Sequence, residues 1–546
     1  MIRGLFTIDP IFLKGFQVTP MVSGPTCRTW MTRMRAVLVS PPVACWLGLG
    51  VLQTLSTIHL HRFNAQRVRL CEWLSASGFL TLPLGEARNQ MATWQTAYDG
   101  ALFFTATLGF GLAALAWLIL QLSAFIPQPR QTRVRIACFA AAGLAMAGYL
   151  NSGGIQVTAT LYTLMPFLSM LLFGLLAGKQ TPSALPHTRT WRVCAGGVVL
   201  CLLFLLPVFV QASFLDIRDY LLLRSDAGRA MNRFYYHHTL YPAEVLKPHV
   251  HRQLKPLVVK GDVPELARIK QLLVRLDALP LDPDHPPDRT AQAVKERPVL
   301  SGLLRLHVTP DTWTFSTERQ TLFNAPAPDL SVGPVRALLR RASEASDRMG
   351  PFRRLILISL VAGVPLFLGI TLIWIPFLCY RRVMPHRYAL PAAVFTLSLI
   401  TGGVTLPFIA TPGRQLDTAH LADALGSTDW RIRRNALIHL HDAGIDPFSL
   451  PGWQPALNRL PDLTDRYYFA RCLAHHSGHQ ADGLIETLLD SPEINVVCKT
   501  AEALGIRGRH ADRNRLFTLI HTSDEAYVQW YVYRALRKLG WRQRLP

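Results

Sequence analysis

Seven apolar stretches, each about long enough to cross a bilayer, interrupt this 546-residue chain and constrain its fold more than any other feature. A helix needs about 20 apolar residues to cross the hydrocarbon, because each residue advances it by only 1.5 Å. In lipid every backbone amide needs a partner within its own segment, so helices are the expected spanning form. The sequence therefore predicts a polytopic α-helical membrane protein with about seven spans, at 36–58, 101–126, 136–150, 155–178, 193–214, 355–379 and 388–410.

The basic residues predict an orientation for these spans. The formal net charge is +22, and short Arg/Lys-rich segments lie at 127–135, 179–192 and 380–387. By the positive-inside rule these segments and the N-terminus face the cytoplasm, whereas 59–100, 215–354 and everything after 411 lie outside. We therefore expect an integral protein of a bacterial inner membrane with periplasmic soluble domains. Its juxtamembrane arginines are expected to contact anionic lipid headgroups; they are Arg33, Arg35, Arg130, Arg133, Arg135, Arg189, Arg192, Arg381, Arg382 and Arg387.

A positive charge can also indicate nucleic-acid binding, because basic chains bind phosphates. However, no basic stripe with interleaved aromatic residues is present, so no nucleic acid is expected as a partner. The nine cysteines show no CxxC or other paired spacing that would indicate a disulfide framework or a metal site. The sequence gives no reason to expect a cofactor.

The segment 215–354 predicts a small soluble α/β domain. An initial helix is expected over 216–236, and the apolar period of 263–276 is that of an amphipathic helix. Short apolar runs at 254–259, 299–308 and 312–315 have the character of strands, and 332–348 is a helix that leads into the sixth span. Strand, helix and strand in this order indicate an α/β domain of about 100 residues.

Four histidines in this segment are the candidate metal ligands: His237, His238, His249 and His251. Histidine and the intervening Glu244 are residue types that bind zinc. Against this, adjacent histidines on a helix point about 100° apart, and the HExxH spacing of zinc enzymes is absent. Histidines beside aromatic residues at a membrane boundary also occur without any metal. No motif marks a catalytic residue, which favours a non-enzymatic protein.

After residue 413 the sequence repeats. Ser491–Val496 aligns with Ser523–Val528 at an offset of 32, and the register continues to Gly508 and Gly540. Each unit consists of a short helix, an acidic Ser/Asp turn and an amphipathic helix that ends at Gly. Because one such unit cannot bury its own apolar face, the units must stack into an α-solenoid.

The segment Asp429–Leu437 resembles the signature of short HEAT-like repeats, the kind of about 30 residues that also occurs in phycobilin lyases. The resemblance covers residues 413–546 only. Two units depart from its Val/Ile-Arg pair, with Tyr468-Phe469 in the second and Val528-Gln529 in the fourth. The resemblance implies a surface that binds proteins. In the lyases this surface handles a chromophore, but no other feature of this sequence indicates chromophore binding.

Together these patterns divide the chain into an N-terminal segment 1–35, spans one to five at 36–214, the α/β domain 215–354, spans six and seven at 355–411 and the repeats 413–546. We expect a membrane-anchored scaffold or assembly protein whose repeats and α/β domain bind other membrane or extracytoplasmic proteins. The candidate partner-binding residues are Trp530, Tyr531, Tyr533, Arg433 and Arg434, although the aromatic residues are equally compatible with a place in the solenoid core. The alternative is a transporter component or a membrane-embedded lipid-modifying enzyme with a Pro-lined cavity between helices.

Overall fold

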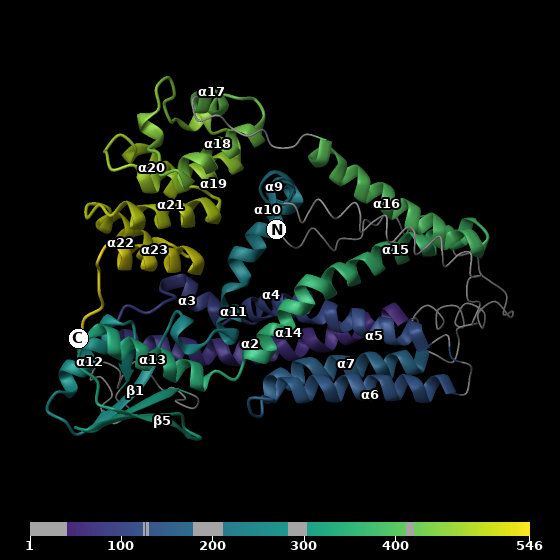
Figure 1. Ribbon diagram of the computed structural model, residues 1–546, viewed down its shortest axis with the longest axis horizontal. Helices are drawn as coiled ribbons and strands as arrows, with labels where there is room; N and C mark the ends of the chain where they lie inside the picture. Colours follow the sequence, from purple (N-terminus) through teal and green to yellow (C-terminus); the bar gives the residue numbers. More distant parts are fainter. Residues whose placement is uncertain are drawn as a thin grey trace, which may run out of the picture.

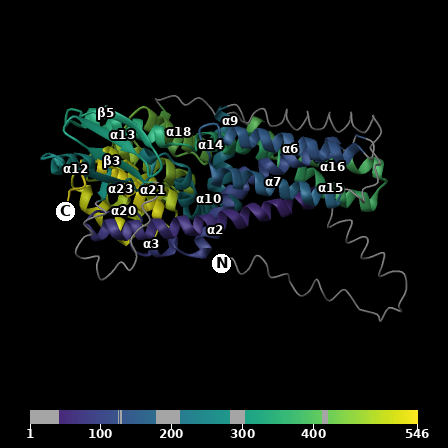
Figure 2. The same cartoon turned by 90° about the horizontal axis from the view of Figure 1, so that it is seen from below.

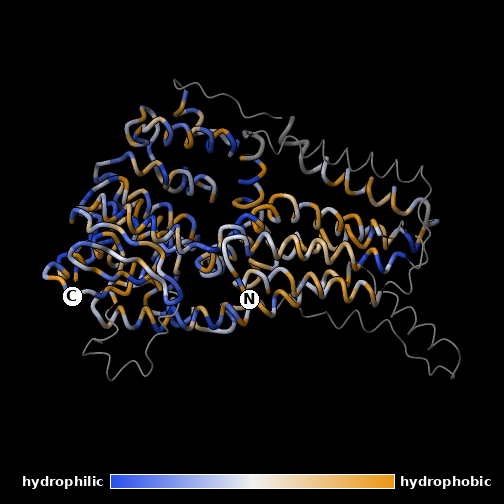
Figure 3. The backbone as a smooth tube through the Cα atoms, turned by 60° about the horizontal axis from the view of Figure 1, so that its bottom comes forward, coloured by the Kyte–Doolittle hydropathy of each residue, from blue (hydrophilic) through white to orange (hydrophobic). Residues whose placement is uncertain are grey.

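The computed structural model describes residues 41–123, 126, 130–177, 211–281, 303–410 and 420–545. This part of the chain is mostly helical and includes one small mixed sheet. The molecule is elongated, with helices α5–α7, α15 and α16 toward one end and the sheet and helices α17–α23 at the other (Figures 1 and 2). Hydrophobic segments accordingly gather at the first end, as Figure 3 shows.

Within the described residues, five helical segments are long and apolar enough to cross a membrane. They overlap with the first four predicted stretches and contain the sixth: Val43–Ala76, Trp94–Leu122, Arg130–Leu150, Val157–Leu175 and Gly350–Val383. The seventh stretch belongs to α16 (His386–Ala410), in which the apolar part Tyr388–Gly403 is shorter. Apart from residues 211–214, the fifth stretch lies outside the described residues, as does the segment 1–35.

The first of these helices differs from the sequence prediction in its length. Helix α2 (Pro41–Ala76) has 36 residues, which corresponds to about 54 Å at 1.5 Å per residue. This is well beyond the roughly 30 Å of a hydrocarbon core. The segment 59–100, expected as a connection between spans, therefore continues α2 for five turns and then forms α3 (Gly85–Met91) and the start of α4 (Trp94–Phe104).

Two π-helical turns meet inside the apolar bundle. The segment from α4 through α5 (Phe110–Leu122) contains the π turn Thr105–Gly109, and the segment from α14 (Gly350–Ile358) to α15 (Val364–Val383) contains the π turn Ser359–Gly363. The hydroxyl of Ser359 donates to the carbonyls of Thr107 and Leu108. A Cβ at Gly363 would lie 2.4 Å from the Cα of Gly111, so the two helices approach at a distance that only glycine permits. Helices α6 (Arg130–Leu150) and α7 (Val157–Ala177) complete this group.

Residues 211–251 form a chain of short helices. They are α9 (Gln211–Asp219), a π turn (Tyr220–Arg224), α10 (Asp226–His238), α11 (Leu240–Leu246) and a 3-10 turn (His249–His251). The predicted helix over 216–236 is present, but it bends at Ser225, which caps α10 by accepting a hydrogen bond from the amide of Gly228. A Cβ at Gly228 would lie only 1.2 Å from the carbonyl oxygen of Leu221, so this bend requires glycine.

The sheet has five strands in the order β2-β1-β3-β4-β5. Strand β1 (Pro256–Gly261) pairs in parallel with β2 (Leu279–Leu281) and β3 (Leu304–Val308), and β4 (Thr312–Ser316) and β5 (Thr321–Pro326) follow in antiparallel. Helices α12 (Leu266–Arg275) and α13 (Val332–Ser346) pack on it. The predicted strands correspond to β1, β3 and β4. Strands β2 and β5 were not predicted, because β2 is only three residues long and β5 lacks alternation.

The C-terminal region forms a stack of helices with one continuous hydrophobic core that runs from Leu421 to Leu539. Helices α18, α19, α21 and α23 pack on one another in this order, and α17, α20 and α22 pack against α18, α21 and α23. Their bounds are Leu421–Leu425 (α17), Trp430–Asp442 (α18), Leu463–Cys472 (α19), Asp482–Leu489 (α20), Ile494–Arg507 (α21), Asp512–Thr522 (α22) and Ala526–Lys538 (α23).

The expected glycine ends are present in three units of this stack. Gly444, Gly508 and Gly540 have positive φ, the left-handed conformation that glycine adopts without strain. The predicted alignment of the second unit, which placed Tyr468-Phe469 at the Val/Ile-Arg pair, requires a correction, because α19 has its N-cap at Asp462. The pair that corresponds to Ile432–Arg433 is therefore Asp465–Arg466, three residues before Tyr468–Phe469.

Candidate functional site

The most regular polar feature of the stack is a row of acidic residues at its helix starts. The N-cap residues of α18, α19, α21 and α23 are Asp429, Asp462, Glu493 and Glu525. We call these four residues the N-cap row. An acidic residue at a helix start is stabilising by itself, because the exposed amides and the helix dipole favour negative charge there. The row is also where the acidic turns of the sequence repeat come together.

The N-cap row is contacted by cations from the helical segment 211–238. Arg224 donates to Asp462 at 2.7 Å, and Arg233 lies 3.7 Å from Glu493. At the far end of the same segment the Nδ1 atom of His237 lies 2.9 Å from Glu525. Figure 1 shows α9 and α10 beside the stacked helices. The acidic turns of the repeat thus hold one basic helical segment of the same chain.

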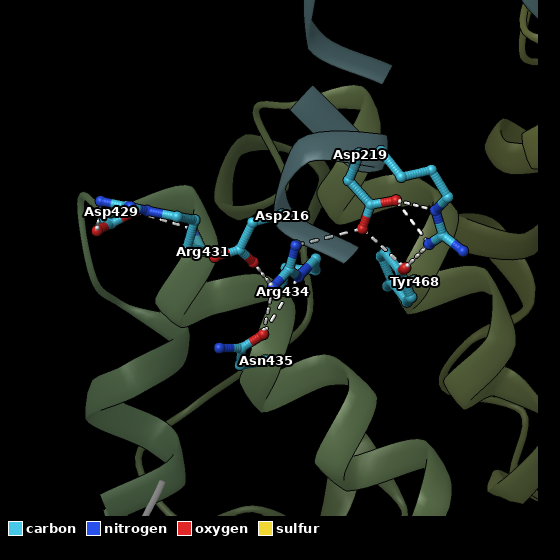
Figure 4. Close-up of polar contacts among 8 residues, drawn as sticks. Asp216, Asp219, Asp429, Arg431, Arg434, Asn435 and Tyr468 are labelled. Atoms are coloured by element: carbon cyan, nitrogen blue, oxygen red, sulfur yellow. Dashed lines mark hydrogen bonds and ion pairs between the residues drawn. The ribbon is translucent and has the colours of Figure 1, made fainter. Parts of the chain in front are cut away.

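Buried charges attach α9 to the first two units. Arg434 is 2% exposed and donates to Asp216, and it lies 3.4 Å from Asp219 (Figure 4). Asp219 also accepts from the hydroxyl of Tyr468 at 2.9 Å and from Arg218. Since both carboxylates are at most 3% exposed, their charge depends on these partners.

The other end of the segment makes a titratable contact. The hydrogen bond that His237 donates to Glu525 raises the pKa of His237 above its usual value, although burial opposes the shift. Next to this pair the ring of Tyr527 packs against Tyr235 and Tyr236, at centroid distances of 6.0 and 5.2 Å. The contact of α10 with α23 is therefore partly aromatic and partly an ion pair that exists when His237 is protonated.

A second set of contacts attaches the end of the stack to the connection after α2. The side-chain amide of Gln529 donates to the carbonyl of Leu84 and accepts from the amide of Leu84. Gln543 makes the same pair of bonds with Leu80. Between these two positions Leu82 is buried in the hydrophobic core of the stack. The connection 77–84 is thus bound to the repeats along its length.

The sheet is joined to the same end of the stack through Asp277. This residue accepts from the hydroxyl of Tyr533 at 2.8 Å and lies 3.2 Å from Arg537, which also donates to the carbonyl of Arg275. Asp277 has a positive φ of 63°, which Asp tolerates better than most residues. The sheet and the repeats are therefore in direct contact.

The four candidate histidines are separated into two pairs. His237 faces Glu525, and His238 lies 3.9 Å from Asp99 of α4. His249 and His251 belong to the 3-10 turn near α13. Glu244, the carboxylate between them in sequence, pairs instead with Arg67 of α2 and with Lys247, at 2.8 and 2.7 Å. Within the described residues no group of three or more His, Cys, Asp or Glu side chains is arranged to hold a metal ion.

Three of the five candidate partner-binding residues are engaged within the chain. Arg433 binds Asp462 and Asp465 of the next unit, Arg434 binds α9, and Tyr533 binds Asp277. Trp530 stacks on Tyr533 at 6.1 Å and is partly buried. Tyr531 keeps a partly exposed ring, over which lie the Nζ of Lys499 at 5.6 Å and the guanidinium of Arg534 at 5.7 Å.

The residues that sequence analysis missed were partly signalled by the repeat itself. Gln529 occupies the position that Arg433 has in the first unit, and this departure from the pattern is where the stack binds Leu84. Tyr468, noted for the same reason, is where it binds Asp219. No repeat or motif identified Asp216, Asp219 or Asp277, because their partners lie more than 200 residues away in sequence. Comparisons with models of protein families, with curated proteins and with solved structures found no match to this chain.

Proposed function

We propose that this protein is a membrane-anchored scaffold whose HEAT-like solenoid and α/β domain bind partner proteins outside the cytoplasm. Five helices of sufficient length and hydrophobicity support the membrane anchor. The sheet and the repeats contact each other through Asp277, so they would lie on one side of a membrane. The α15–α16 corner, next to Arg381 and Arg382, lies at the opposite end (Figure 1). The positive-inside rule assigns that end to the cytoplasm and the solenoid to the periplasm of a bacterial inner membrane.

The observation that carries the proposal is the N-cap row and its contacts. Four stacked units bring their acidic helix starts together, and three of these residues contact two arginines and one histidine of one helical segment. Stacked helical repeats characteristically use such extended surfaces to bind other polypeptides. This stack holds a helical segment in cis, which supports a role in polypeptide binding.

Since the segment 211–238 covers the N-cap row, we assign the external partner to the neighbouring surface of α21 and α23. Its centre is Tyr531, flanked by Lys499, Glu502, Arg534 and Lys538 around a shallow hollow. An aromatic ring with adjacent cations is the composition typical of residues that contribute most to protein interfaces. We therefore expect a small binding surface on this chain, centred on Tyr531, that can accept an acidic partner.

Affinity purification in mild detergent tests this assignment. A full-length tagged chain should retain stoichiometric partner proteins, and Tyr531→Ala should lower the retained amount by about tenfold, as expected for loss of a central aromatic contact. Tyr98→Ala is the matched control, because Tyr98 is an exposed tyrosine on α4, which is not part of the repeats. Equal retention by both variants would contradict the assignment.

The histidines provide a second test of the class of function. The quadruple change of His237, His238, His249 and His251 to Gln should leave partner retention within about twofold of the wild type, since the four side chains do not form one site. If the wild-type protein binds one equivalent of zinc and this variant does not, the scaffold proposal is wrong and a metal-dependent enzyme takes its place. Inductively coupled plasma mass spectrometry measures the metal directly.

The alternative of transport or lipid modification requires a cavity among the apolar helices. A hollow of about 250 Å³ lies between α5, α14 and α15 beside the two π turns. Its lining residues are apolar or small, and neither a proline nor an ionisable side chain is among those described. A substrate-coupling or catalytic group would have to be supplied from elsewhere, so the scaffold remains the function that the geometry supports best.

A further inference from the structure

A polar pocket of about 160 Å³ lies where the sheet and the turn before α7 meet the start of α14. We call it the boundary pocket and define it by Gln156, Lys247, His249, Arg252, Asp347 and Arg348. Gln156 belongs to the turn between α6 and α7, and Asp347 and Arg348 directly precede α14. The pocket therefore lies at the extramembrane end of three of the five apolar helices.

Two guanidinium groups in the boundary pocket lack an acidic partner. Within the described part of the chain, neither Arg252 nor Arg348 forms an ion pair, and Arg252 donates only to the carbonyl of Lys247. The two acids nearby are already engaged, Glu244 by Arg67 and Lys247, and Asp347 by Arg353. Burial lowers the pKa of Arg252 although Glu244 and Asp347 nearby oppose the shift, so its charged form is still penalised at this position. A cation held in this way is stabilised by an anion.

His249 adds a neutral polar group to the same pocket. Burial, with Arg252 and Lys255 nearby, lowers the pKa of His249 to about 3, so its ring is uncharged at neutral pH. Its Nε2 atom is shielded from solvent and has no hydrogen-bond partner among the described residues. A buried polar atom without a partner is rare in folded proteins and indicates a water or a ligand. Two unpaired cations and one unpaired imidazole nitrogen make an anion site that can accept a tetrahedral phosphate.

The surroundings indicate where such a phosphate comes from. On either side of Gln156, Ile155 and Val157 are 77% and 62% exposed, as expected for residues that face acyl chains. The apolar hollow described above begins at Leu355, six residues further along α14 than Met349 of the boundary pocket. That separation corresponds to about 9 Å along the helix. A ligand with an anionic head and an apolar tail matches a polar pocket followed by an apolar hollow, whereas a free anion would occupy the boundary pocket alone.

We propose that the boundary pocket binds the phosphate of an anionic lipid headgroup, with Arg252 and Arg348 as its cationic contacts. The neighbouring apolar hollow then receives part of an acyl chain. This inference rests on the membrane setting of the proposed function but not on partner binding. It differs from a general attraction of juxtamembrane arginines to lipid, because it predicts one bound lipid at one built site on the side of the sheet and the repeats.

Native mass spectrometry of the full-length protein in detergent tests the proposal. With phosphatidylglycerol the wild type should retain one lipid per chain at concentrations where phosphatidylcholine is lost. Arg348→Gln is the first variant, since Arg348 forms no ion pair among the described residues, and Arg252→Gln/Arg348→Gln is the second. We expect the affinity to fall by about tenfold for the first and further for the second, as for loss of charge-assisted hydrogen bonds.

Arg336→Gln/Arg340→Gln is the matched control, because it removes the same charge from exposed positions of α13. This control should bind phosphatidylglycerol as the wild type does. Equal losses in the two double variants, no loss in Arg348→Gln, or equal retention of phosphatidylcholine would each overturn the proposal. Excess inorganic phosphate should not release the lipid. If it does, or if it binds with one-to-one stoichiometry in place of the lipid, the pocket takes a soluble anion and the lipid assignment is wrong.

If the proposed membrane anchor is wrong, the experiment gives a different result from the one expected if only the lipid site is wrong. A chain that stays soluble and monodisperse after removal of detergent would contradict the proposed anchor, whatever it binds. A chain that needs detergent but shows no preference for phosphatidylglycerol would contradict only the boundary pocket. The two outcomes are read from size-exclusion chromatography and mass spectrometry of one preparation.

Discussion

The two ends of the repeat stack are attached to the rest of the molecule by different chemistry. At the first end Arg434 enters a buried cluster of charges with Asp216 and Asp219 of α9. At the last end Gln529 and Gln543 bind the backbone of Leu84 and Leu80 through neutral amides. Both attachments are buried, and both join segments that are far apart in sequence. The two attachments differ in the free energy that is lost when one partner is removed.

A buried charge depends on its partner far more than a buried amide does. Removal of one member of a buried ion cluster leaves uncompensated charge in a medium of low dielectric constant. Gln529 satisfies the backbone amide of Leu84 and adds a bond to its carbonyl, which also accepts from the amide of Arg88. Its loss costs these two hydrogen bonds and a third to the carbonyl of Ser523, but it leaves no unpaired charge. The comparison therefore predicts a ranking of effects.

The largest effect is expected for Arg434→Ala. This change leaves Asp216 buried without its guanidinium and Asp219 with Arg218 as its remaining cation, and it should lower the free energy of unfolding by about 3–5 kcal/mol. Thermal unfolding in detergent, followed by circular dichroism, measures the loss. The triple variant Asp216→Asn/Asp219→Asn/Arg434→Met tests the cause, since it removes all three charges. If it is no more stable than Arg434→Ala, uncompensated charge is not the reason.

Gln529→Leu should have the second largest effect. The amide of Leu84 and the carbonyl of Ser523 lose their side-chain partner, and the carbonyl of Leu84 keeps only the amide of Arg88, which together costs about 2–3 kcal/mol. Hydrogen exchange should show faster exchange at 79–84 and at the start of α23, with α18 and α9 unchanged. Gln480→Leu is the control, because Gln480 is exposed on the same stack and should change little. An effect that spreads to α9 would mean that the two ends are not independent.

A smaller effect is expected where the segment 211–238 bends. Gly228→Ala places a methyl group against the carbonyl of Leu221 and should cost about 1–3 kcal/mol by forcing the backbone apart. Cysteine crosslinking between α10 and α21 should report that the two helices separate. Gly483→Ala, in α20 with no atom within 4 Å of the added Cβ, should be neutral or slightly stabilising. If both variants behave alike, the bend does not position α10.

The smallest effect is a pH dependence at the contact of α10 with α23. Because the hydrogen bond to Glu525 raises the pKa of His237 above 6.5, this contact stabilises fully below pH 6.5 and weakens as the pH rises through the raised value. Asp524 supports the protonated form, whereas Arg233 and burial oppose it. Since His237 is 40% exposed, the change is modest, and it is best seen as faster hydrogen exchange of α10 at high pH. His237→Gln should abolish the pH dependence, and a dependence that persists would assign it to another group.

Several elements could be predicted because their information is local. Helix α12 lies inside the predicted 263–276, and α13 covers most of the predicted 332–348, since both have a clear apolar period. The acidic turns of the repeat correspond to the N-caps of α18, α21 and α23, as the capping of a helix depends only on its first turn. The extension of α2 past 58 was missed, because the polar residues after 58 end an apolar pattern but do not end a helix.

The candidate site was predicted less well than the elements that form it. Arg433 and Arg434 were selected as residues that bind a partner, and they do bind, but within the same chain. The sequence by itself determined the apolar helices, the repeating unit and the acid at each helix start, because these depend on periodicity and on neighbours in sequence. Only the tertiary structure decided that this acidic row holds the segment 211–238 and that Arg252 and Arg348 share a pocket whose one acid, Asp347, is paired with Arg353. Such pairings depend on the packing of distant segments, and the charge of a residue does not specify which opposite charge it will meet.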